Sequence, residues 1–310
     1  MTPFFSITIP AYKTAFLGKA IASVCAQTCA DWELIVVDDA SPEDIQSVVK
    51  GFADSRIRYY RNAKNCGAVN VVDNWNICLS YCRGQYVICM GDDDMLAPSA
   101  LEAYAALMNR YPALNVYHAM TDVIDENDEV TGHQRRRPEY QTAEDLIMHR
   151  WGGDIQFIGD FCYRVDHLRG CGGYYKLPLA WASDDITAVR AAEQTGIANT
   201  QSVGFLYREN RGSITSGRNN GLKLDAKACE RQWYLDFFRR HPQVPPALYP
   251  EAFDSWFHGQ IGLHLTQYFE ESVGNLVPAL RKREALGWKK RKILSRWWRV
   301  LCHKIRSEHI

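Results

Sequence analysis

The sequence predicts an α/β fold: a largely parallel β-sheet covered by helices, followed by a helical C-terminal region. Three observations support this prediction. Over the first 120 residues, short apolar runs rich in β-formers alternate with segments of helical spacing, the pattern of a parallel sheet. Residues 34–37 are all aliphatic, as expected for a strand buried on both faces. From about residue 222 the pattern is helical and aromatic.

Each expected element follows from local spacing. The strands are short apolar runs bounded by turn residues, at 4–10, 34–37, 57–60, 86–90 and 115–121. Between them, apolar residues recur at intervals of three and four, which predicts helices at 16–28, 68–82 and 98–110. We expect a further helix to start at Ser41, with the serine as N-cap and Pro42 in the first turn.

The remaining segments are less regular. Residues 122–150 are polar and charged, and we expect a loop-rich excursion there. Residues 151–215 carry glycine-rich turns and a second acidic pair, Asp184 and Asp185. A proline-rich break interrupts the helical pattern at 242–250. The regular α/β pattern is therefore confined to the first part of the chain.

Composition excludes several classes of protein. The chain has 310 residues, of which 46% are hydrophobic and 23% charged, so it is globular rather than disordered. Lys and Arg number 36, as do Asp and Glu, so no net charge favours nucleic acid as a partner. The ten cysteines form no Cys-x-x-Cys pair, which is typical of buried thiols in a reducing cytosol. There is no signal-peptide pattern and no bilayer-spanning apolar run, so we expect a cytoplasmic protein.

Three consecutive carboxylates, Asp92, Asp93 and Asp94, follow the fourth expected strand. Parallel sheets bind ligands at the carboxyl ends of their strands. Adjacent negative charges repel one another, and bound Mn²⁺ or Mg²⁺ would relieve the repulsion because hard cations prefer oxygen ligands. The alternative is a solvated acidic turn that caps the helix at Pro98. The usual glycine-rich phosphate loops, Gly-x₄-Gly-Lys-Ser/Thr and Gly-x-Gly-x-x-Gly, are absent.

A second carboxylate pair, Asp38 and Asp39, ends the second expected strand. Neighbouring side chains of an extended chain face opposite ways, so the two cannot share one role. One can accept the imide N–H of a uracil or thymine ring, while the other caps the helix that follows. The alternative is that both serve only as caps.

Six segments, in this order, resemble successive blocks of the family 2 glycosyltransferases. They are ITIPAYK (7–13), DWELIVVDDAS (31–41), NCGAVNVVDNWNICLSYCRGQYV (65–87), GDDDMLAP (91–98), RGCGGYYKLPLAWASDD (169–185) and FLYRENRGSITS (205–216). The resemblance implies a GT-A fold with a Rossmann-like nucleotide-binding half. It also implies an enzyme of the hexosyltransferase type, which transfers a sugar with inversion from a nucleotide-diphosphate donor, expected to be a UDP-sugar, with help from a divalent metal.

The same resemblance implies a domain organisation. Residues 1–216 are expected to form the GT-A domain, with a nucleotide-binding half at 1–120 and an acceptor half at 121–216. Residues 217–310 are expected to form a helical extension.

Individual residues take roles from the matching blocks. Asp39 matches the carboxylate that reads the pyrimidine, and Asp92 the one near the ribose. Asp93 matches the ligand of Mn²⁺ or Mg²⁺, with Asp94 beside it as a second candidate. The further nucleotide-binding positions are Pro10, Ala11, Tyr12, Asn65 and Arg208, the last in a Tyr-Arg block whose loop often closes over the diphosphate.

Asp184 precedes Arg190 by six residues, which matches the family's acidic block and makes Asp184 the candidate general base, with Asp185 second. Three positions depart from the family pattern: Gly91 replaces the first Asp of an Asp-x-Asp, Ser183 replaces a Glu, and Asn210 stands where a His is common. These departures keep a catalytically inactive nucleotide-sugar-binding or scaffold protein as the alternative. A sugar nucleotidyltransferase is less favoured, because the N-terminal segment lacks a basic, glycine-rich loop.

The segment 281–310 is a basic amphipathic tail, with 11 Lys or Arg and 2 Asp or Glu. On a helix, its tryptophans and aliphatic residues share one arc, and most of its cations lie opposite. This pattern predicts peripheral attachment to the anionic inner face of the cytoplasmic membrane, close to a lipid-linked or glycan acceptor. The alternative is that the helix packs on the protein's own acidic body. Polysaccharide biosynthesis is the expected setting by analogy with the family.

Overall fold

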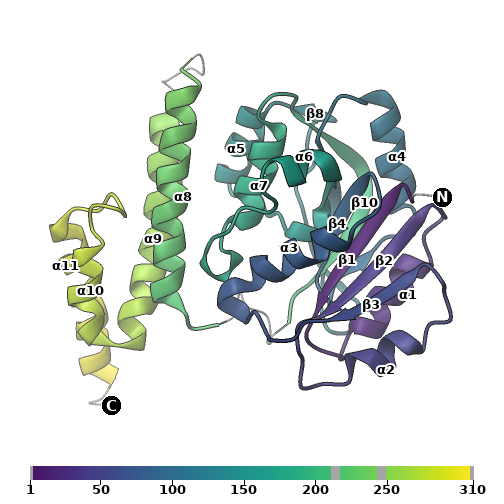
Figure 1. Cartoon of the computed structure of the whole chain (residues 1–310). Coiled ribbons are helices and arrows are strands. Elements are labelled where there is room, and N and C mark those ends of the chain that lie inside the picture. The colour runs from purple at the N-terminus through teal and green to yellow at the C-terminus, as the bar shows by residue number, and fades with distance from the viewer. Residues whose placement is uncertain (1–2, 211–216, 243–248, 308–310) are drawn as a thin grey trace. The chain divides into compact units, whose positions relative to one another are not determined.

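A computed structural model describes residues 3–210, 217–242 and 249–307 (Figure 1). The chain divides into two compact units, Met1–Lys176 with Ser183–Ser213 and Leu177–Ala182 with Ile214–Ile310. The domain limit predicted at residue 216, the end of the block at 205–216 and most of the proline-rich break at 242–250 lie outside the described residues. The sequence did not predict that the short segment 177–182 belongs to the second unit.

The first unit is built on a mixed sheet that contains ten strands in the described part of the chain. Eight strands run in the order β3-β2-β1-β4-β9-β6-β10-β5, with β7 paired to β6 and β8 to β10. Their bounds are β1 Phe5–Ala11, β2 Trp32–Asp38, β3 Ile57–Arg61, β4 Tyr86–Cys89, β5 Met95–Leu96, β6 Val116–Ile124, β7 Val130–His133, β8 Tyr140–Gln141, β9 Phe161–Arg164 and β10 Ile197–Arg208.

Helices cover both faces of this sheet (Figure 1). Side chains alternate along β1, so Phe5, Ile7 and Ile9 face a core that includes α1 (Leu17–Cys25), α2 (Ile45–Lys50) and α4 (Ala100–Arg110). The opposite face of β1 carries Ser6, whose hydroxyl accepts the Gly84 N–H directly after α3 (Val71–Tyr81). Each fully buried Ile or Phe contributes roughly 1.5–3 kcal/mol. The unit is completed by α5 (Ala143–Trp151), α6 (Val165–Gly170) and α7 (Ser183–Ala192).

All five predicted strands and the helices predicted at 16–28, 68–82 and 98–110 are present, with shifts of a few residues. The predicted start of the second helix is wrong. The N-cap of α2 is Asp44, whose side chain accepts the Ser47 N–H, whereas the hydroxyl of Ser41 donates to the carbonyl oxygen of Tyr12 at 2.6 Å. Ser41 thus binds the loop after β1 instead of capping α2.

The segment 122–150 is more regular than predicted, because it contains β7, β8 and α5. Strand β10 was also missed, although it pairs in parallel with β6 inside the sheet. Its apolar pattern is interrupted by the polar sequence Asn-Thr-Gln-Ser at 199–202, and the register with β6 shifts at the same place. A bulged strand does not show the simple alternation on which sequence patterns depend.

The second unit is helical, as the sequence predicts. It contains α8 (Asn220–Arg240), α9 (Tyr249–Glu271), α10 (Leu276–Arg281) and α11 (Lys290–Ser307). Helix α8 packs along α9, α11 packs on α9 and α10, and Ile293 and Val300 of α11 are buried. No helix in the described ranges is both long and apolar enough to span a membrane.

Candidate functional site

The carboxyl ends of six strands, β1, β2, β3, β4, β6 and β10, lie at one edge of the sheet, since β3 pairs in parallel with β2. Strands β1, β2 and β4 pair in parallel, as do β6 and β10. Strand β9 lies antiparallel between β4 and β6, so those two also run in the same direction. The predicted positions Tyr12, Asp39, Asp92 and Arg208 therefore share this edge, although they come from distant parts of the sequence.

The turn after β4, residues 91–94, is called the acidic turn here. Asp92 joins it to the loop after β1, because one of its oxygens accepts the N–H groups of both Tyr12 and Lys13 at 2.7 Å. Burial raises the pKa of Asp92 to about 6, against the lowering effect of those two hydrogen bonds. Asp92 thus fixes the loop that carries Tyr12, whose side chain is 41% exposed.

Asp94 points into the protein. It is 4% exposed, and its two oxygens accept the N–H groups of Arg208 at 2.8 Å and Gly91 at 3.2 Å. Burial, followed by the charge of Asp93, raises the pKa of Asp94 well above its ordinary value. These contacts make Asp94 a residue that closes the acidic turn, and they leave it poorly placed for its predicted role as a metal ligand.

Asp93 accepts fewer hydrogen bonds from described residues than the other two carboxylates of the turn. Its Oδ2 accepts the side-chain N–H of Asn210, and no described residue donates to its Oδ1. It is partly exposed, unlike Asp94. Among the three acidic side chains, Asp93 therefore has the best position for a cation.

Arg208, predicted to contact the diphosphate, is fully buried in the structure. Its guanidinium donates to the carbonyl oxygens of Asp93 and Asp125 at 2.7 and 2.5 Å and lies 2.6 Å from the carboxylate of Asp128. The ring of Phe16 covers it at 4.4 Å. In this conformation the buried guanidinium of Arg208 binds the backbone of the acidic turn and is not exposed to a ligand.

Gly91 is explained by the packing of the acidic turn. A Cβ at this position would lie 2.7 Å from Oδ1 of Asp93 and 2.8 Å from Oδ2 of Asp94. Both distances are shorter than a real Cβ contact allows. An aspartate here, which many relatives are expected to carry, would therefore require the carboxylates of Asp93 and Asp94 to shift.

The pair Asp38 and Asp39 divides its roles, as the alternation of an extended chain requires. Asp38 is fully buried and accepts the Ser41 N–H at 2.8 Å, the Tyr59 hydroxyl at 2.7 Å and the guanidinium of Arg61. It caps the turn after β2 instead of the helix. Asp39 faces the loop after β3.

That loop supplies the partners of Asp39. Its carboxylate accepts the side-chain N–H of Asn62 at 2.8 Å and the backbone N–H of Cys66 at 3.0 Å. Asn65, predicted to bind the nucleotide, folds its side-chain oxygen onto the Gly67 N–H. Burial, reinforced by Asp39, raises the pKa of the Cys66 thiol to about 11. The loop and Asp39 thus form one hydrogen-bonded group at the end of β2.

The strand predicted at 4–10 extends one residue further, because β1 contains Pro10, as predicted, and also Ala11. Ala11 is fully buried. The Ala11 carbonyl oxygen accepts the Asp39 N–H at 2.9 Å. The backbone of Ala11 therefore ties the end of β1 to Asp39, and Tyr12 is the first exposed side chain after it.

Asp184 and Asp185 lie at the start of α7 in contrasting surroundings. Asp185 is 2% exposed, and one of its oxygens accepts Nε of Arg150 at 2.9 Å and Nε2 of Gln156 at 2.6 Å. Asp184 is less buried and accepts only the Asp185 N–H, at 3.0 Å, among the described residues. The geometry favours Asp184 over Asp185 as the group that meets a substrate.

The electrostatics of Asp184 point the same way. Burial and, second, the charge of Asp185 raise the pKa of Asp184 to about 8, while Arg150 opposes the shift. A general base works best when its pKa lies near the operating pH. Asp184 therefore has both a free oxygen and a suitable pKa.

The structure brings some of these residues together and leaves others apart. Asp93, Asp94, Arg208 and Asn210 form one hydrogen-bonded group, and Asp92 binds the loop after β1. No hydrogen bond or ion pair between described residues joins Asp93 to Asp184. Arg150 and Gln156, which hold Asp185, were not foreseen. No local signal marks them, because Gln156 contacts Asp185 across 29 residues of sequence.

A resident metal site of protein ligands alone is not found in the described part of the chain, where no three His, Cys, Asp or Glu side chains converge suitably. Mg²⁺, however, is commonly bound by one or two carboxylates together with substrate phosphates. The free oxygen of Asp93 fits that mode of binding. A carboxylate oxygen is a ligand that hard cations prefer, so Asp93 could bind a cation that is also coordinated by a diphosphate.

Comparison with known proteins identifies relatives of this chain. Residues 6–167, slightly more than half of it, match the model of glycosyl transferase family 2. The matched region begins within β1, includes β2 to β9 and the acidic turn, and ends in α6.

Two curated relatives come from Escherichia coli. The putative colanic acid biosynthesis glycosyl transferase WcaA of strain K12 is 37% identical over 107 residues, which cover 34% of this chain and 37% of the relative. The UDP-Glc:alpha-D-GlcNAc-diphosphoundecaprenol beta-1,3-glucosyltransferase WfgD is 34% identical over 104 residues, which cover 33% of this chain and 40% of the relative. The matches therefore span well under two thirds of the length of these relatives.

Among solved structures, Staphylococcus aureus TarS 1–349 in complex with UDP-GlcNAc is similar over 98% of this chain and 92% of its own, with a TM-score of 0.64 and 15% sequence identity. At this level of identity, the likeness concerns the fold. It confirms the predicted GT-A fold with a helical C-terminal region.

Proposed function

Because the chain belongs to the family 2 glycosyltransferases, we propose that it is an inverting enzyme that transfers a sugar from a UDP-sugar to a hydroxyl group. The acceptor is a glycan or a lipid-linked sugar. Two observations on relatives support the choice of substrates: TarS was crystallised with UDP-GlcNAc, and the name of WfgD specifies UDP-Glc and a diphosphoundecaprenol acceptor. Activity with inversion agrees with the absence of a recognisable nucleophile motif in the sequence.

The proposal is supported by the different hydrogen bonding of the five carboxylates. Asp92 and Asp94 are bound by backbone N–H groups, and Asp185 by Arg150 and Gln156. Each of these three carboxylates accepts two hydrogen bonds from described residues, whereas Asp93 and Asp184 accept one each. An enzyme of this type needs one carboxylate at the diphosphate and one at the acceptor.

We assign the nucleotide to the edge formed by β1, β2 and β4. Asp39 would accept the imide N–H of the pyrimidine in exchange for one of its present donors, and Tyr12 would cover the base. Pro10, Ala11 and Asn65 shape this part of the edge, and Asp92 stands beside it near the ribose. Asp94 and Arg208 act as positioning residues that hold the acidic turn.

Asp93 is the proposed ligand for Mn²⁺ or Mg²⁺. When bound with the donor, the cation would neutralise charge on the departing diphosphate. Asp184 would remove the proton of the acceptor hydroxyl as that oxygen attacks the anomeric carbon, and UDP would leave from the opposite side. A single displacement of this kind inverts the configuration of the sugar.

Release of UDP from UDP-Glc and UDP-GlcNAc tests this function without knowledge of the acceptor. In the presence of Mn²⁺, water should replace the acceptor slowly, and EDTA should stop the release. A nucleotide-sugar-binding scaffold would instead bind the donor and release no UDP. Absence of both binding and release would contradict the proposal.

We further propose that the tail brings the enzyme to the inner face of the cytoplasmic membrane. Part of the apolar arc of α11 is buried against α9, but Trp298 and Ile305 remain 58% and 47% exposed. Exposed tryptophan beside several cations favours an anionic lipid interface.

Vesicle co-sedimentation tests this attachment with point variants that spare the buried face of α11. The pair Trp298→Ser and Ile305→Ser should reduce pelleting with anionic vesicles. The matched pair Leu263→Ser and Val277→Ser, at side chains that are 51% and 55% exposed, should not. Equal pelleting of both pairs would leave α11 as a packing element.

A further inference from the structure

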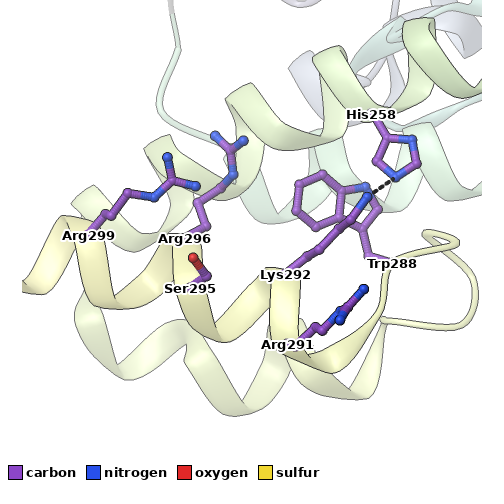
Figure 2. A pocket seen from close by; sticks show the side chains of 7 residues that line it. All are labelled: His258, Trp288, Arg291, Lys292, Ser295, Arg296 and Arg299. Atoms are coloured by element: carbon purple, nitrogen blue, oxygen red, sulfur yellow. Dashed lines mark hydrogen bonds between the residues drawn. The ribbon is translucent and has the colours of Figure 1, made fainter.

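A basic pocket lies between α9 and α11 in the second unit (Figure 2). It has a volume of about 550 Å³, within the usual range for small-molecule sites. The seven residues that line it are His258, Trp288, Arg291, Lys292, Ser295, Arg296 and Arg299. Four of these, the three arginines and Lys292, carry a positive charge. We call it the α9–α11 pocket.

The cations of the α9–α11 pocket are not neutralised by carboxylates. No ion pair between described residues involves Arg291, Lys292, Arg296 or Arg299. Burial and, second, the charge of Arg299 lower the pKa of Arg296 from its ordinary value. Like charges held this close in a concave site repel one another, and an anion would relieve that repulsion.

The pocket is built by specific contacts rather than by chance proximity of long side chains. Arg296 donates to the Thr266 hydroxyl at 2.8 Å, and its Nε–H is buried without a partner among the described residues. The absence of a side chain at Gly262 leaves room for this guanidinium, because a Cβ there would lie 2.9 Å from it. Arg296 is therefore seated on α9, with donor capacity to spare.

His258 and Trp288 complete the wall opposite. His258 Nδ1 lies 2.8 Å from the Asp254 carbonyl oxygen, which can only accept, so Nδ1 carries the proton. Its Nε2 is then free to accept from Lys292 Nζ at 3.3 Å, as Figure 2 shows. The Trp288 ring lies 5.5 Å from both the His258 ring and the Arg296 guanidinium. The ammonium and guanidinium groups are thus held in place before a ligand arrives.

We propose that the α9–α11 pocket binds a phosphoryl anion with more than one negative charge, such as a diphosphate group. Guanidinium groups match phosphate oxygens in a bidentate manner, and four cations in one cavity suit an anion with more than one negative charge. The anion can come from a lipid headgroup or from a free phosphate compound. This proposal is independent of the transferase activity, since every residue that carries it lies in the second unit.

Calorimetry with inorganic pyrophosphate on the full chain tests the pocket. EDTA is included so that the metal-dependent donor site does not contribute. The test variant is Lys292→Gln with Arg299→Gln, two exposed positions that leave Arg296 seated. The control is Lys290→Gln with Arg306→Gln, which removes the same charge from α11 outside the pocket.

We expect the double variant in the pocket, Lys292→Gln with Arg299→Gln, to bind pyrophosphate about tenfold or more weakly, with an unchanged melting temperature. The control variant should bind pyrophosphate with the affinity of the wild-type chain. No binding by the wild-type chain, or equal weakening by both pairs, would overturn the proposal. Vesicles of phosphatidylglycerol and phosphatidylcholine then distinguish the source. If the pocket variant no longer binds phosphatidylglycerol vesicles, and pyrophosphate competes with these vesicles for the wild-type chain, the ligand is a lipid headgroup. If the variant binds the vesicles as the wild-type chain does, the ligand is a free phosphate compound.

Discussion

The Nε–H of Arg208 donates a 2.7 Å hydrogen bond to the backbone carbonyl oxygen of Asp93. The arginine ending β10 therefore determines the position of the acidic turn after β4, across 115 residues of sequence. Because the backbone N–H of Arg208 also binds Asp94, one residue holds two neighbours of the turn. The side chain of Asp93 is left partly exposed, with one hydrogen bond from Asn210 among the described residues.

Arg208→Lys should destabilise the protein and weaken metal-dependent UDP binding. Lysine keeps the charge but cannot make the same set of directional bonds from a fully buried position. We expect a loss of about 1–3 kcal/mol in the free energy of unfolding. Chemical denaturation and calorimetry measure the two effects.

Lys19 provides a matched control for this variant, because it binds the same Asp128 carboxylate and also lies over Phe16, but on the surface. Lys19→Met should change stability by less than about 1 kcal/mol. Similar losses in both variants would mean that the buried contacts of Arg208 have no special role.

Gly91→Asp should weaken binding of UDP with metal, even though it restores the Asp-x-Asp sequence that the resemblance leads one to expect. The new Cβ would collide with the carboxylates of Asp93 and Asp94. Crowding of this kind typically destabilises by about 1–3 kcal/mol. Gly91→Ala has the same Cβ without the new charge and should show a similar loss. Tighter metal-dependent binding in Gly91→Asp would refute this explanation of the glycine.

Asp93→Asn should make UDP binding independent of Mn²⁺, because the proposed cation loses its protein carboxylate. Titration with UDP in Mn²⁺ and in EDTA should then give the same weak affinity. Asp166→Asn removes an exposed carboxylate of α6 and should keep the full difference between the two conditions. If Asp93→Asn also keeps it, the cation is held elsewhere.

Asp185→Asn should move the acidic limb of the turnover profile to lower pH. The charge of Asp185 raises the pKa of Asp184, so its removal lowers that pKa. A base is active when deprotonated, and a lower pKa therefore extends activity toward acid. The measurement is the rate of UDP release against pH at saturating donor and metal. A limb that stays in place, or moves toward alkaline pH, would disagree with the coupling of the two carboxylates.

The sequence predicts the elements of the first unit well where local spacing determines them. The aliphatic run at 34–37 and the helical spacing at 16–28 each specify one structure, and both are present. The helix after β2 shows where local reasoning fails. Ser41 and Asp44 are both good N-caps, and the choice between them is made by the Tyr12 carbonyl oxygen, which engages Ser41.

The site is less predictable than the elements, since its partners are distant in the sequence. Motif resemblance points to Asp93 and Asp184, but nothing near either residue shows which carboxylates are already engaged. Asp94 is bound by a backbone group 114 residues away, and Asp185 by Arg150, 35 residues away. Only the folded chain brings these donors to the acids.

The proposed transferase mechanism is tested most directly by a paired measurement on Asp184→Asn, with Asp166→Asn as control. UDP affinity in Mn²⁺ reports the nucleotide edge, and the rate of UDP release from a UDP-sugar reports the proton acceptor. If Asp184 is the general base, the variant should keep its UDP affinity and lose turnover by ~10²–10⁴-fold, which is typical for such a group. Full turnover in Asp184→Asn, with the same affinity, would contradict that role.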